Sequence, residues 1–379
     1  MKIAMVSGRA SPLAVFDDGP IERRHVHVAE LSAALTREGH DVTVYTRRES
    51  RRTPATVGSP DGYRVVHVPA GPARKLREDE LLPLLGDFTR VLRSRWAKDR
   101  PDVVHAHFWS SGLVSLLAAK DLGLPVTQTF HTLGDGHHED RIRVERMIAK
   151  QASRVLAASS DEVLSLVRLG MPRPRASVVS GGVDPAKFTV DGETARRTAR
   201  YRIVSVGGPG ADVVITALAS LPETELVLAG NLTTADTRRL RELAERAGVI
   251  DRIRTVGWVP RQDLPALLRS ADVVVCTPPS DPSVLVPLEA MACGVSVVAA
   301  SVGVLADTVI DGVTGLLVSP GNSKELAGAL RRLLADASAR EAFGVAGHDR
   351  VRARYSWDRV AADCARAYAL ASRDMPSHV

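Results

Sequence analysis

The sequence is poor in cysteine and in aromatic residues, and it has no long hydrophobic run. Its three cysteines, Cys276, Cys293 and Cys364, lie far apart and in no metal-ligand spacing, so we expect buried thiols in a reducing compartment. No apolar stretch approaches the roughly 20 residues that a membrane-spanning helix needs. The first residues, MKIAMVSGRASPL, are interrupted too early for a signal peptide. We therefore expect a cytoplasmic protein without stable membrane insertion.

Lysine is absent from a long central stretch, between Lys187 and Lys324. Arginine supplies most of the positive charge, and the net charge is +6 with an isoelectric point near 9.5. The arginines are scattered over many segments that also contain acids, a pattern typical of a solvated surface. We therefore expect no nucleic-acid partner. The excess of arginine over lysine, together with alanine-rich helices, is typical of a bacterial, GC-rich genome.

Short β-branched runs alternate with longer amphipathic segments along the 379 residues. Examples are KIAMVS, DVTVYT and DVVHAHF, each followed by a helical pattern such as HVAELSAALTREG or GLVSLLAAKDLG. Such runs, bounded by Gly, Pro or Asp, are typical of buried parallel strands. A chain of this length exceeds one ordinary core. The sequence therefore predicts two doubly wound α/β domains, whose ligands bind at the carboxyl ends of the strands.

A change in pattern near DPAKFTVDGETARRTAR places the predicted boundary between the domains. We expect an N-terminal domain over residues 1–188, a linker over 189–200 and a C-terminal domain over 201–356. Residues 357–379 form a further helix, which we expect to pack back on the N-terminal domain. The oligomeric state is not indicated by the sequence.

Segments from both halves resemble the family 4 retaining glycosyltransferases, in particular the mycothiol-pathway and sucrose-phosphate-synthase-like members. They include DVVHAHFWSSG, TQTFHTLG and SGGVDPAKF in the first half, and LEAMACGVSVVAAS in the second. The resemblance implies the GT-B architecture, with two Rossmann-like domains facing each other across a cleft. It also implies a nucleotide-diphosphate-sugar donor, a small-molecule acceptor, retention at the anomeric carbon and no cofactor or metal.

The resemblance assigns a donor site to the second domain. The family has two acids separated by seven positions, and Asp281 and Glu289 stand at that spacing. Glu289 would hold the ribose hydroxyls from a helix start, while Asp281 is either a catalytic-site residue or an ordinary turn residue. The backbone at Val284 and Leu285 would contact the sugar. Valine here replaces a family glycine, so we expect an altered loop or an altered sugar.

Histidines of the first domain are the other candidate site residues. His131 in TFHTLG matches a family histidine that faces the donor sugar, and a structural role is the alternative. We expect His105 and His107, in VVHAHF, to point to opposite faces of a strand, so that they do not bind one metal together. His137 and His138 lie in a polar loop that we expect to be solvated. The sequence thus predicts no metal site.

Two departures from the family pattern affect the phosphate site. In FDDGPIERRHVHV, Glu22 and Arg23 stand roughly where the family has a pair of glycines. Arg9, Arg23 or Arg24 could offer a planar guanidinium to an anion, and solvated arginines are the alternative.

The second departure lies in the loop of YRIVSVGGPGADVV. An arginine and a lysine that neutralise the leaving diphosphate in the family are missing, since Arg202 is the one cation between Tyr201 and Leu221 and precedes the strand core. The amides of Gly207 and Gly208 could meet the phosphate instead.

These observations predict a glycosyltransferase with a degenerate diphosphate site, acting in bacterial secondary or small-molecule metabolism. Two alternatives remain open. The chain could be an enzyme with an unusual donor, or a non-catalytic homologue that serves as a binding or partner protein.

Overall fold

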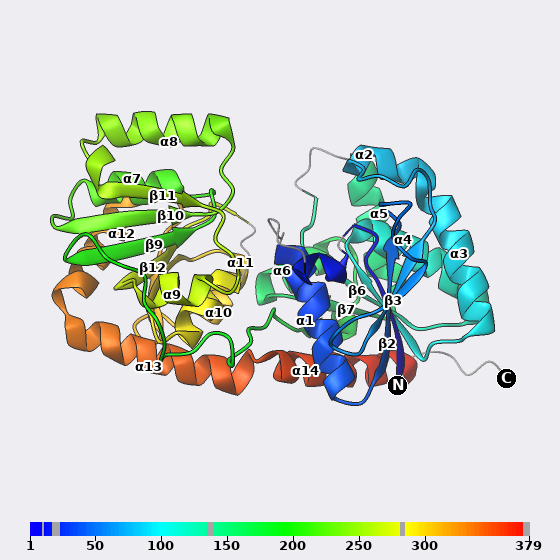
Figure 1. Ribbon diagram of the computed structural model, residues 1–379. Helices are drawn as coiled ribbons and strands as arrows, with labels where there is room; N and C mark the ends of the chain where they lie inside the picture. Colours follow the sequence, from blue (N-terminus) through cyan, green and yellow to red (C-terminus); the bar gives the residue numbers. More distant parts are fainter. Residues whose placement is uncertain (10, 17–22, 135–138, 281–284, 374–379) are drawn as a thin grey trace. The chain divides into compact units, whose positions relative to one another are not determined.

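The computed structural model describes residues 1–9, 11–16, 23–134, 139–280 and 285–373. It divides into two compact units. The first contains residues 1–180 together with the C-terminal helix, and the second contains residues 181–356. Residues 181–200, which the sequence analysis divided between the first domain and a linker, belong to the second unit. Figure 1 shows the helices and strands of both units along the chain.

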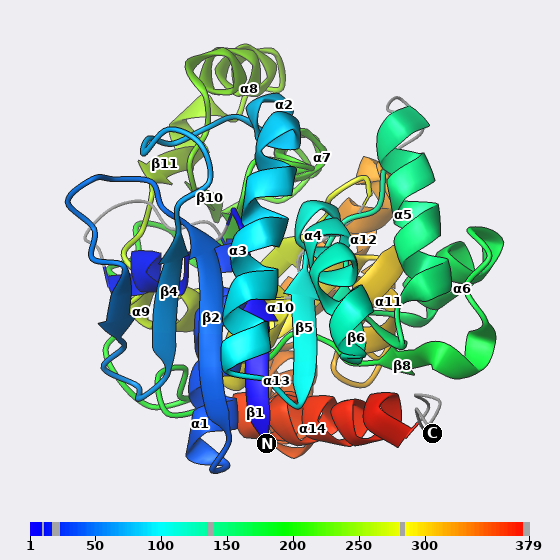
Figure 2. The ribbon, with the colours of Figure 1, turned by 90° about the vertical axis from the view of Figure 1, so that its right-hand side faces the viewer.

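The first unit is built on an eight-stranded sheet with the order β3-β4-β2-β1-β5-β6-β7-β8. All neighbouring strands are parallel except the pair of β3 and β4. Figure 2 shows β4, β2, β1, β5 and β6 side by side. The strands are β1 (Lys2–Val6), β2 (Asp41–Arg47), β3 (Thr56–Gly58), β4 (Arg64–Val68), β5 (Val103–His107), β6 (Val126–Thr129), β7 (Arg154–Ala157) and β8 (Ala176–Val178).

Helices of the first unit cover this sheet in two groups. One group pairs α1 (Arg23–Arg37) with α14 (Trp357–Arg373), and the other packs α4 (Trp109–Ala119) against α3 (Leu85–Lys98) and α5 (Glu139–Gln151). The remaining helices are α2 (Glu78–Leu81) and α6 (Ser160–Arg168). The central strands β1, β5 and β6 are buried along nearly their whole length, because helices pack on both faces of the sheet there.

The second unit has a six-stranded, wholly parallel sheet with the order β11-β10-β9-β12-β13-β14. Its strands are β9 (Tyr201–Val206), β10 (Thr224–Ala229), β11 (Ile253–Gly257), β12 (Val273–Cys276), β13 (Ser296–Ala300) and β14 (Gly315–Val318). Its helices are α7 (Ala211–Leu218), α8 (Thr234–Arg246), α9 (Leu264–Arg269), α10 (Leu285–Ala292), α11 (Gly303–Thr308), α12 (Ser323–Ala335) and α13 (Ala337–Arg354). The predicted fold class, two Rossmann-like α/β domains, is confirmed.

A large apolar core in the second unit joins β9, β10 and β12 to α7, α8 and α12. It consists mainly of Val, Leu and Ile, which come both from the strands and from the helices that cover them. At about 25 cal/mol per Å² of apolar surface removed from water, burial of this kind is the main force that holds the layers together. Among the described helices, none combines the length and the apolar composition that crossing a membrane would demand.

The expectation of buried thiols is confirmed, since Cys276, Cys293 and Cys364 are all buried and none of these three described cysteines forms a disulfide. Burial raises the pKa of the Cys293 thiol and of the Cys364 thiol to about 12. Both thiols are therefore protonated at neutral pH and take part in packing rather than in chemistry.

Candidate functional site

Two residues with strained backbones mark the carboxyl edge of the first sheet. Phe108 directly follows β5 and has φ 71°, and His131 follows β6 by two residues and has φ 64°. Their rings stack with centroids 4.5 Å apart. Left-handed backbone is rare for bulky side chains, and such outliers concentrate at functional sites. The predicted site residue His131 is therefore held in an unusual conformation at the sheet edge where ligands of this fold class bind.

His131 belongs to a group of closely packed imidazole rings. His107 Nδ1 and His131 Nε2 lie 2.9 Å apart, and their rings stack. The His27 ring, from α1, lies edge-on to His131 with centroids 4.8 Å apart and to His107 with centroids 5.7 Å apart. One ring nitrogen from each of these three histidines lies within 4.8 Å of the others.

The prediction that His105 and His107 point to opposite faces of their strand is wrong. Residues two apart in a strand share a face, and the two rings lie 4.2 Å apart. His105 itself bonds to the Tyr368 hydroxyl at 2.7 Å and to the Thr129 hydroxyl at 2.9 Å, so its role is structural. Burial lowers the pKa of His105 to about 3 and that of His27 to about 4. Burial also holds the pKa of His107 well below its usual value.

An arginine that the sequence analysis did not single out lies beside the residue after His131. Arg141, in the first turn of α5, donates from Nη2 to the Thr132 carbonyl at 2.9 Å. Its Nε donates to the buried carboxylate of Glu145 at 2.7 Å, and that carboxylate also accepts from the Gly134 amide. The guanidinium is therefore oriented from both sides. The only indication of this arrangement in the sequence is the i, i+4 spacing of Arg141 and Glu145. Pairs of this kind are common on exposed helices, so the spacing does not mark a site.

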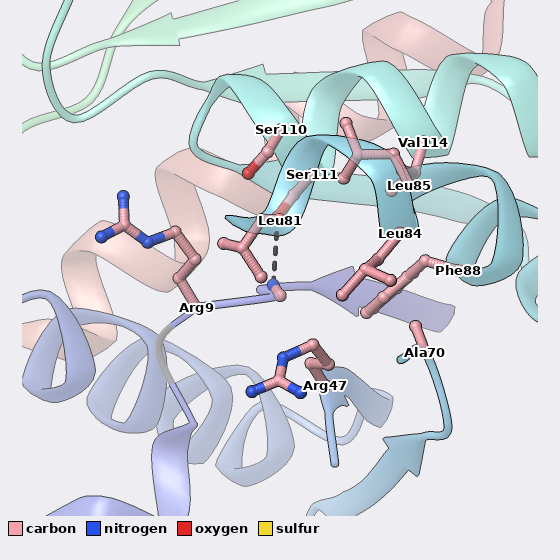
Figure 3. A pocket seen from close by; sticks show the side chains of 11 residues that line it. Arg9, Arg47, Ala70, Leu81, Leu84, Leu85, Phe88, Ser110, Ser111 and Val114 are labelled. Carbon is pink, nitrogen blue, oxygen red and sulfur yellow. Dashed lines mark hydrogen bonds between the residues drawn. The ribbon is translucent and has the colours of Figure 1, made fainter. Parts of the chain in front are cut away.

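A small cavity lies at the carboxyl ends of β1 and β2 (Figure 3). It is lined by Gly8, Arg9, Arg47, Ala70, Leu81, Leu84, Leu85, Phe88, Ser110, Ser111 and Val114. In Figure 3 the guanidinium of Arg9 is directed away from the leucines. Arg47 is held by the Pro72 carbonyl at 2.8 Å and by the Arg74 carbonyl. The predicted phosphate-loop residue Arg9 thus lies at a largely apolar cavity, which has few groups that match sugar hydroxyls.

Arg23 and Arg24, the other arginines predicted to lie in a phosphate-binding loop, are not in a loop. They are the first two residues of α1, because the helix begins earlier than the sequence pattern suggested. Their side chains, and residue Glu22, lie outside what the structure describes, as do His137 and His138.

In the second unit, Glu289 is buried on α10 and accepts a hydrogen bond from Arg261 Nη1 at 2.7 Å. Glu289 is the fifth residue of the described part of α10, so its predicted place at a helix start is wrong. Pro287 fits into the first turn of this part of the helix, because the first backbone amides of a helix have no partner within it. Leu285 begins the described part of α10. Asp281 and Val284 lie outside the described residues.

Backbone hydrogen bonds and close backbone packing together fix the glycine loop after β9. The Gly207 amide donates to the Ala229 carbonyl at 2.8 Å, so one of the two predicted phosphate donors is engaged. Gly210 has φ 82° and precedes α7, and a Cβ there would lie 1.9 Å from the Thr277 carbonyl oxygen. The Thr277 hydroxyl also donates to the Gly210 carbonyl. Gly210 is therefore required by the close approach of two backbones.

Arg202 cannot replace the arginine and lysine that the predicted diphosphate site lacks. It lies inside β9 rather than before the strand core, and it is buried. Its Nε donates to Glu225 Oε1 at 2.8 Å, and its terminal nitrogens donate to the Ser270 hydroxyl and to the Arg196 carbonyl. These contacts engage the guanidinium within the core of the second unit.

Two doubly wound sheets, one wholly parallel and one parallel except for the pair of β3 and β4, define a two-domain α/β protein of the GT-B class. Residues 25–187 match the family model "Glycosyltransferase Family 4", and residues 205–350 match "Glycosyl transferases group 1". The chain belongs to the family 4 glycosyltransferases and is a glycosyltransferase, as its sequence resemblance predicted.

Related proteins match over almost the whole chain. A D-inositol 3-phosphate glycosyltransferase of Xylanimonas cellulosilytica is 36% identical, over 99% of this chain and 98% of the relative. One from Kribbella flavida is 33% identical, over 99% and 96%. Among solved structures, a sucrose-phosphate synthase from Thermosynechococcus elongatus matches with TM-score 0.87 and 27% identity, over 97% of this chain and 98% of that one. The Anabaena protein Alr3699/HepE, in complex with UDP and glucose, shares the fold, with TM-score 0.75 and 19% identity, over 97% and 99%.

Proposed function

We propose that this enzyme transfers a sugar, with retention, from a nucleoside-diphosphate donor to a small phosphorylated polyol. The observation that carries the proposal is His131, held in left-handed backbone at the end of β6 and stacked on Phe108. The surrounding fold keeps a costly conformation at this position, so its side-chain direction serves a purpose other than stability. In this proposal His131 donates a hydrogen bond to the transferred sugar.

The acceptor class is supported by Arg141 and by the relatives. Arg141 lies beside Thr132, directly after His131, and its guanidinium is oriented by Glu145. A planar guanidinium suits a phosphate group because it can donate two parallel hydrogen bonds. The relatives named above are D-inositol 3-phosphate glycosyltransferases. We infer that the phosphate of a polyol acceptor binds at Arg141.

The donor nucleotide is assigned to the second unit, with Glu289 as the ligand of the ribose hydroxyls. A buried carboxylate accepts two hydrogen bonds well from a vicinal diol, because its two oxygens match the spacing of the hydroxyls. Arg261 fixes one of these oxygens in the unliganded protein. The Gly208 amide and the first turn of α7 are the groups we propose for the diphosphate.

The transfer step requires neither an enzyme nucleophile nor a metal in this proposal. The bond between the anomeric carbon and the leaving phosphate oxygen breaks while the acceptor hydroxyl oxygen bonds to the same face of that carbon. The acceptor proton passes to the leaving phosphate oxygen, and the nucleoside diphosphate departs. Hydrogen-bond donors at the phosphate stabilise the charge that develops there.

Calorimetric titration with UDP, GDP, ADP and TDP and with their sugars tests this function. We expect one nucleotide to bind with a Kd below about 1 mM, and Glu289→Ala to abolish that binding. Absence of binding by every nucleotide would contradict the donor assignment. The control variant is Glu242→Ala, which removes a carboxylate from the exposed side of α8.

Turnover separates the enzyme from a non-catalytic homologue. With the nucleotide sugar that binds, we expect product formation from inositol phosphates but not from unphosphorylated inositol, and release of product with the donor's anomeric configuration. Arg141→Gln should raise KM for the phosphorylated acceptor, whereas Arg143→Gln, two positions further along α5 and exposed, should not. Nucleotide binding without turnover on any phosphorylated polyol would favour the non-catalytic alternative.

A further inference from the structure

We propose that His27, His107 and His131 form a site for one divalent transition-metal ion, with zinc as the best match, and that zinc bound there inhibits transfer. The metal site stands on the geometry of the first unit. The inhibition rests on the proposed function, because it follows from the role of His131. The inference departs from the sequence-based expectation of no metal site. That expectation rested on the family resemblance, on the expected faces of His105 and His107, and on a solvated loop at His137 and His138.

The three rings converge from separate parts of the chain. His27 comes from α1, His107 from the end of β5, and His131 from the segment after β6. Their ring centroids are 4.8, 5.2 and 5.7 Å apart. With tetrahedral geometry and Zn–N bonds of about 2.0–2.1 Å, three imidazoles on one zinc ion have centroids about 5 Å apart. The observed spacing therefore suits three ligands of one ion.

The donor nitrogens are already close to the separation that a metal needs. On a tetrahedral zinc, two ligand nitrogens lie about 3.3–3.4 Å apart. His107 Nδ1 and His131 Nε2 are 2.9 Å apart, and one nitrogen of each of the three rings lies within 4.8 Å of the others. A side-chain rotation at His27 would bring the third nitrogen to the same separation.

The surroundings favour binding by neutral imidazole. His107 is fully buried, and no group among the described residues forms a hydrogen bond with its Nε2. Phe108 stacks on His131, and Trp357 packs edge-on against His27 with centroids 5.3 Å apart. A set of three histidines leaves the fourth position of the metal to water or to a substrate oxygen, as in catalytic zinc sites. Imidazole ligands suit zinc, copper and nickel rather than magnesium or calcium.

A simple hydrogen bond between two neutral rings is the competing explanation. It accounts for the contact between His107 and His131, since one ring donates and the other accepts. It does not account for the third ring, His27, whose donor atom lies in the same small volume. The two explanations differ in what they predict for zinc.

The test uses the tag-free 379-residue chain, stripped with chelator and titrated calorimetrically with zinc chloride in the absence of nucleotide. We expect one zinc per chain, and cobalt in its place should give the intense visible bands of tetrahedral coordination. His27→Gln and His131→Asn should each weaken zinc binding at least about 10-fold. The control His40→Gln removes a histidine that lies three residues beyond the C-terminal end of α1, and it should leave binding unchanged.

Two results would overturn the site: no stoichiometric zinc, or equal affinity in wild type and both variants. Far-ultraviolet circular dichroism and thermal melting identify a variant that fails to fold. Asparagine at position 131 is chosen because it tolerates left-handed backbone. Since zinc binding is measured without donor, a failed nucleotide titration contradicts the proposed function and leaves the metal result intact.

The inhibition has its own readout. With a donor and acceptor that turn over, zinc should lower the initial rate, and chelator should restore it. The zinc concentration for half inhibition should rise at least about 10-fold in His27→Gln, measured against that variant's own zinc-free rate. Stoichiometric zinc binding without any effect on transfer would overturn the inhibitory role.

Discussion

Arg261 holds the buried carboxylate of Glu289 through a hydrogen bond of 2.7 Å, and its guanidinium lies over the ring of Phe188. This contact joins the segment after β11 to α10 within the second unit. The carboxylate predicted to bind ribose is therefore oriented before any ligand arrives.

We expect Arg261→Met to lower the free energy of unfolding of the second unit by about 1–3 kcal/mol, because a buried acceptor loses its donor. Peptide-resolved hydrogen exchange in increasing urea would measure this for the second unit alone. The matched control is Arg254→Met, an exposed arginine in β11, which should change stability by less than about 0.5 kcal/mol. Equal effects of the two variants would show that the contact with Glu289 contributes nothing.

Removing one partner of the buried pair of Arg202 and Glu225 should lower the free energy of unfolding by more than Arg261→Met does. Both side chains are almost fully buried, and they meet at 2.8 Å. Arg202→Met leaves the Glu225 carboxylate uncompensated, and we expect a loss of about 3–5 kcal/mol from the second unit. The double variant Arg202→Met with Glu225→Leu should recover most of that loss. If the single variant is as stable as wild type by the same exchange experiment, the pair is not a structural requirement.

The same carboxylate predicts a pH dependence of stability. Burial raises the pKa of Glu225, but hydrogen bonds from Thr198 and Arg202 outweigh burial and leave this pKa below its ordinary value of 4.5. The folded state thus favours the charged form. Stability from Glu225 is present above pH 4.5 and is lost as the pH falls through the lowered pKa. Urea midpoints between pH 6 and pH 3 should decline less steeply in Glu225→Gln than in wild type; parallel declines would contradict the assignment.

Gly210 offers a test of the loop after β9. Its backbone has φ 82°, and an added Cβ would lie 1.9 Å from the Thr277 carbonyl oxygen. We expect Gly210→Ala to destabilise the second unit by more than about 1 kcal/mol, since alanine fits neither the conformation nor the space. Gly328→Ala is the matched control, because Gly328 lies in α12 with open space around it. Gly328→Ala should raise the free energy of unfolding of the second unit by about 0.4–1 kcal/mol. A neutral Gly210→Ala would show that the loop can move away from Thr277.

The sequence predicted much of the fold because strand and helix periodicity is local. KIAMV, VVHAH and VVVC read as buried strands, and each lies in a parallel sheet. Family membership also followed from local motifs. His131, predicted from TFHTLG, lies at the carboxyl edge of its sheet beside a second strained residue.

Other features depend on contacts that periodicity does not report. The sequence pattern places Arg202 before its strand core, whereas in the structure it lies inside β9 and pairs with Glu225 of the neighbouring strand. Glu289 was placed at a helix start, yet α10 includes residues from Leu285. The sequence pattern does not indicate Arg141, because its role depends on a contact with Thr132, nine residues earlier in the chain.

The sequence by itself determined two parallel α/β units, buried thiols and membership of a glycosyltransferase family, since these follow from residue type and short-range spacing. Only the tertiary structure brought His27, His107 and His131 together, because they lie on three elements separated by up to about a hundred residues. It also showed that Gly210, in the loop after β9, is required by the close approach of the Thr277 backbone. Side chains distant in sequence meet only when the sheet order is fixed, and that order is set by the packing of the whole unit.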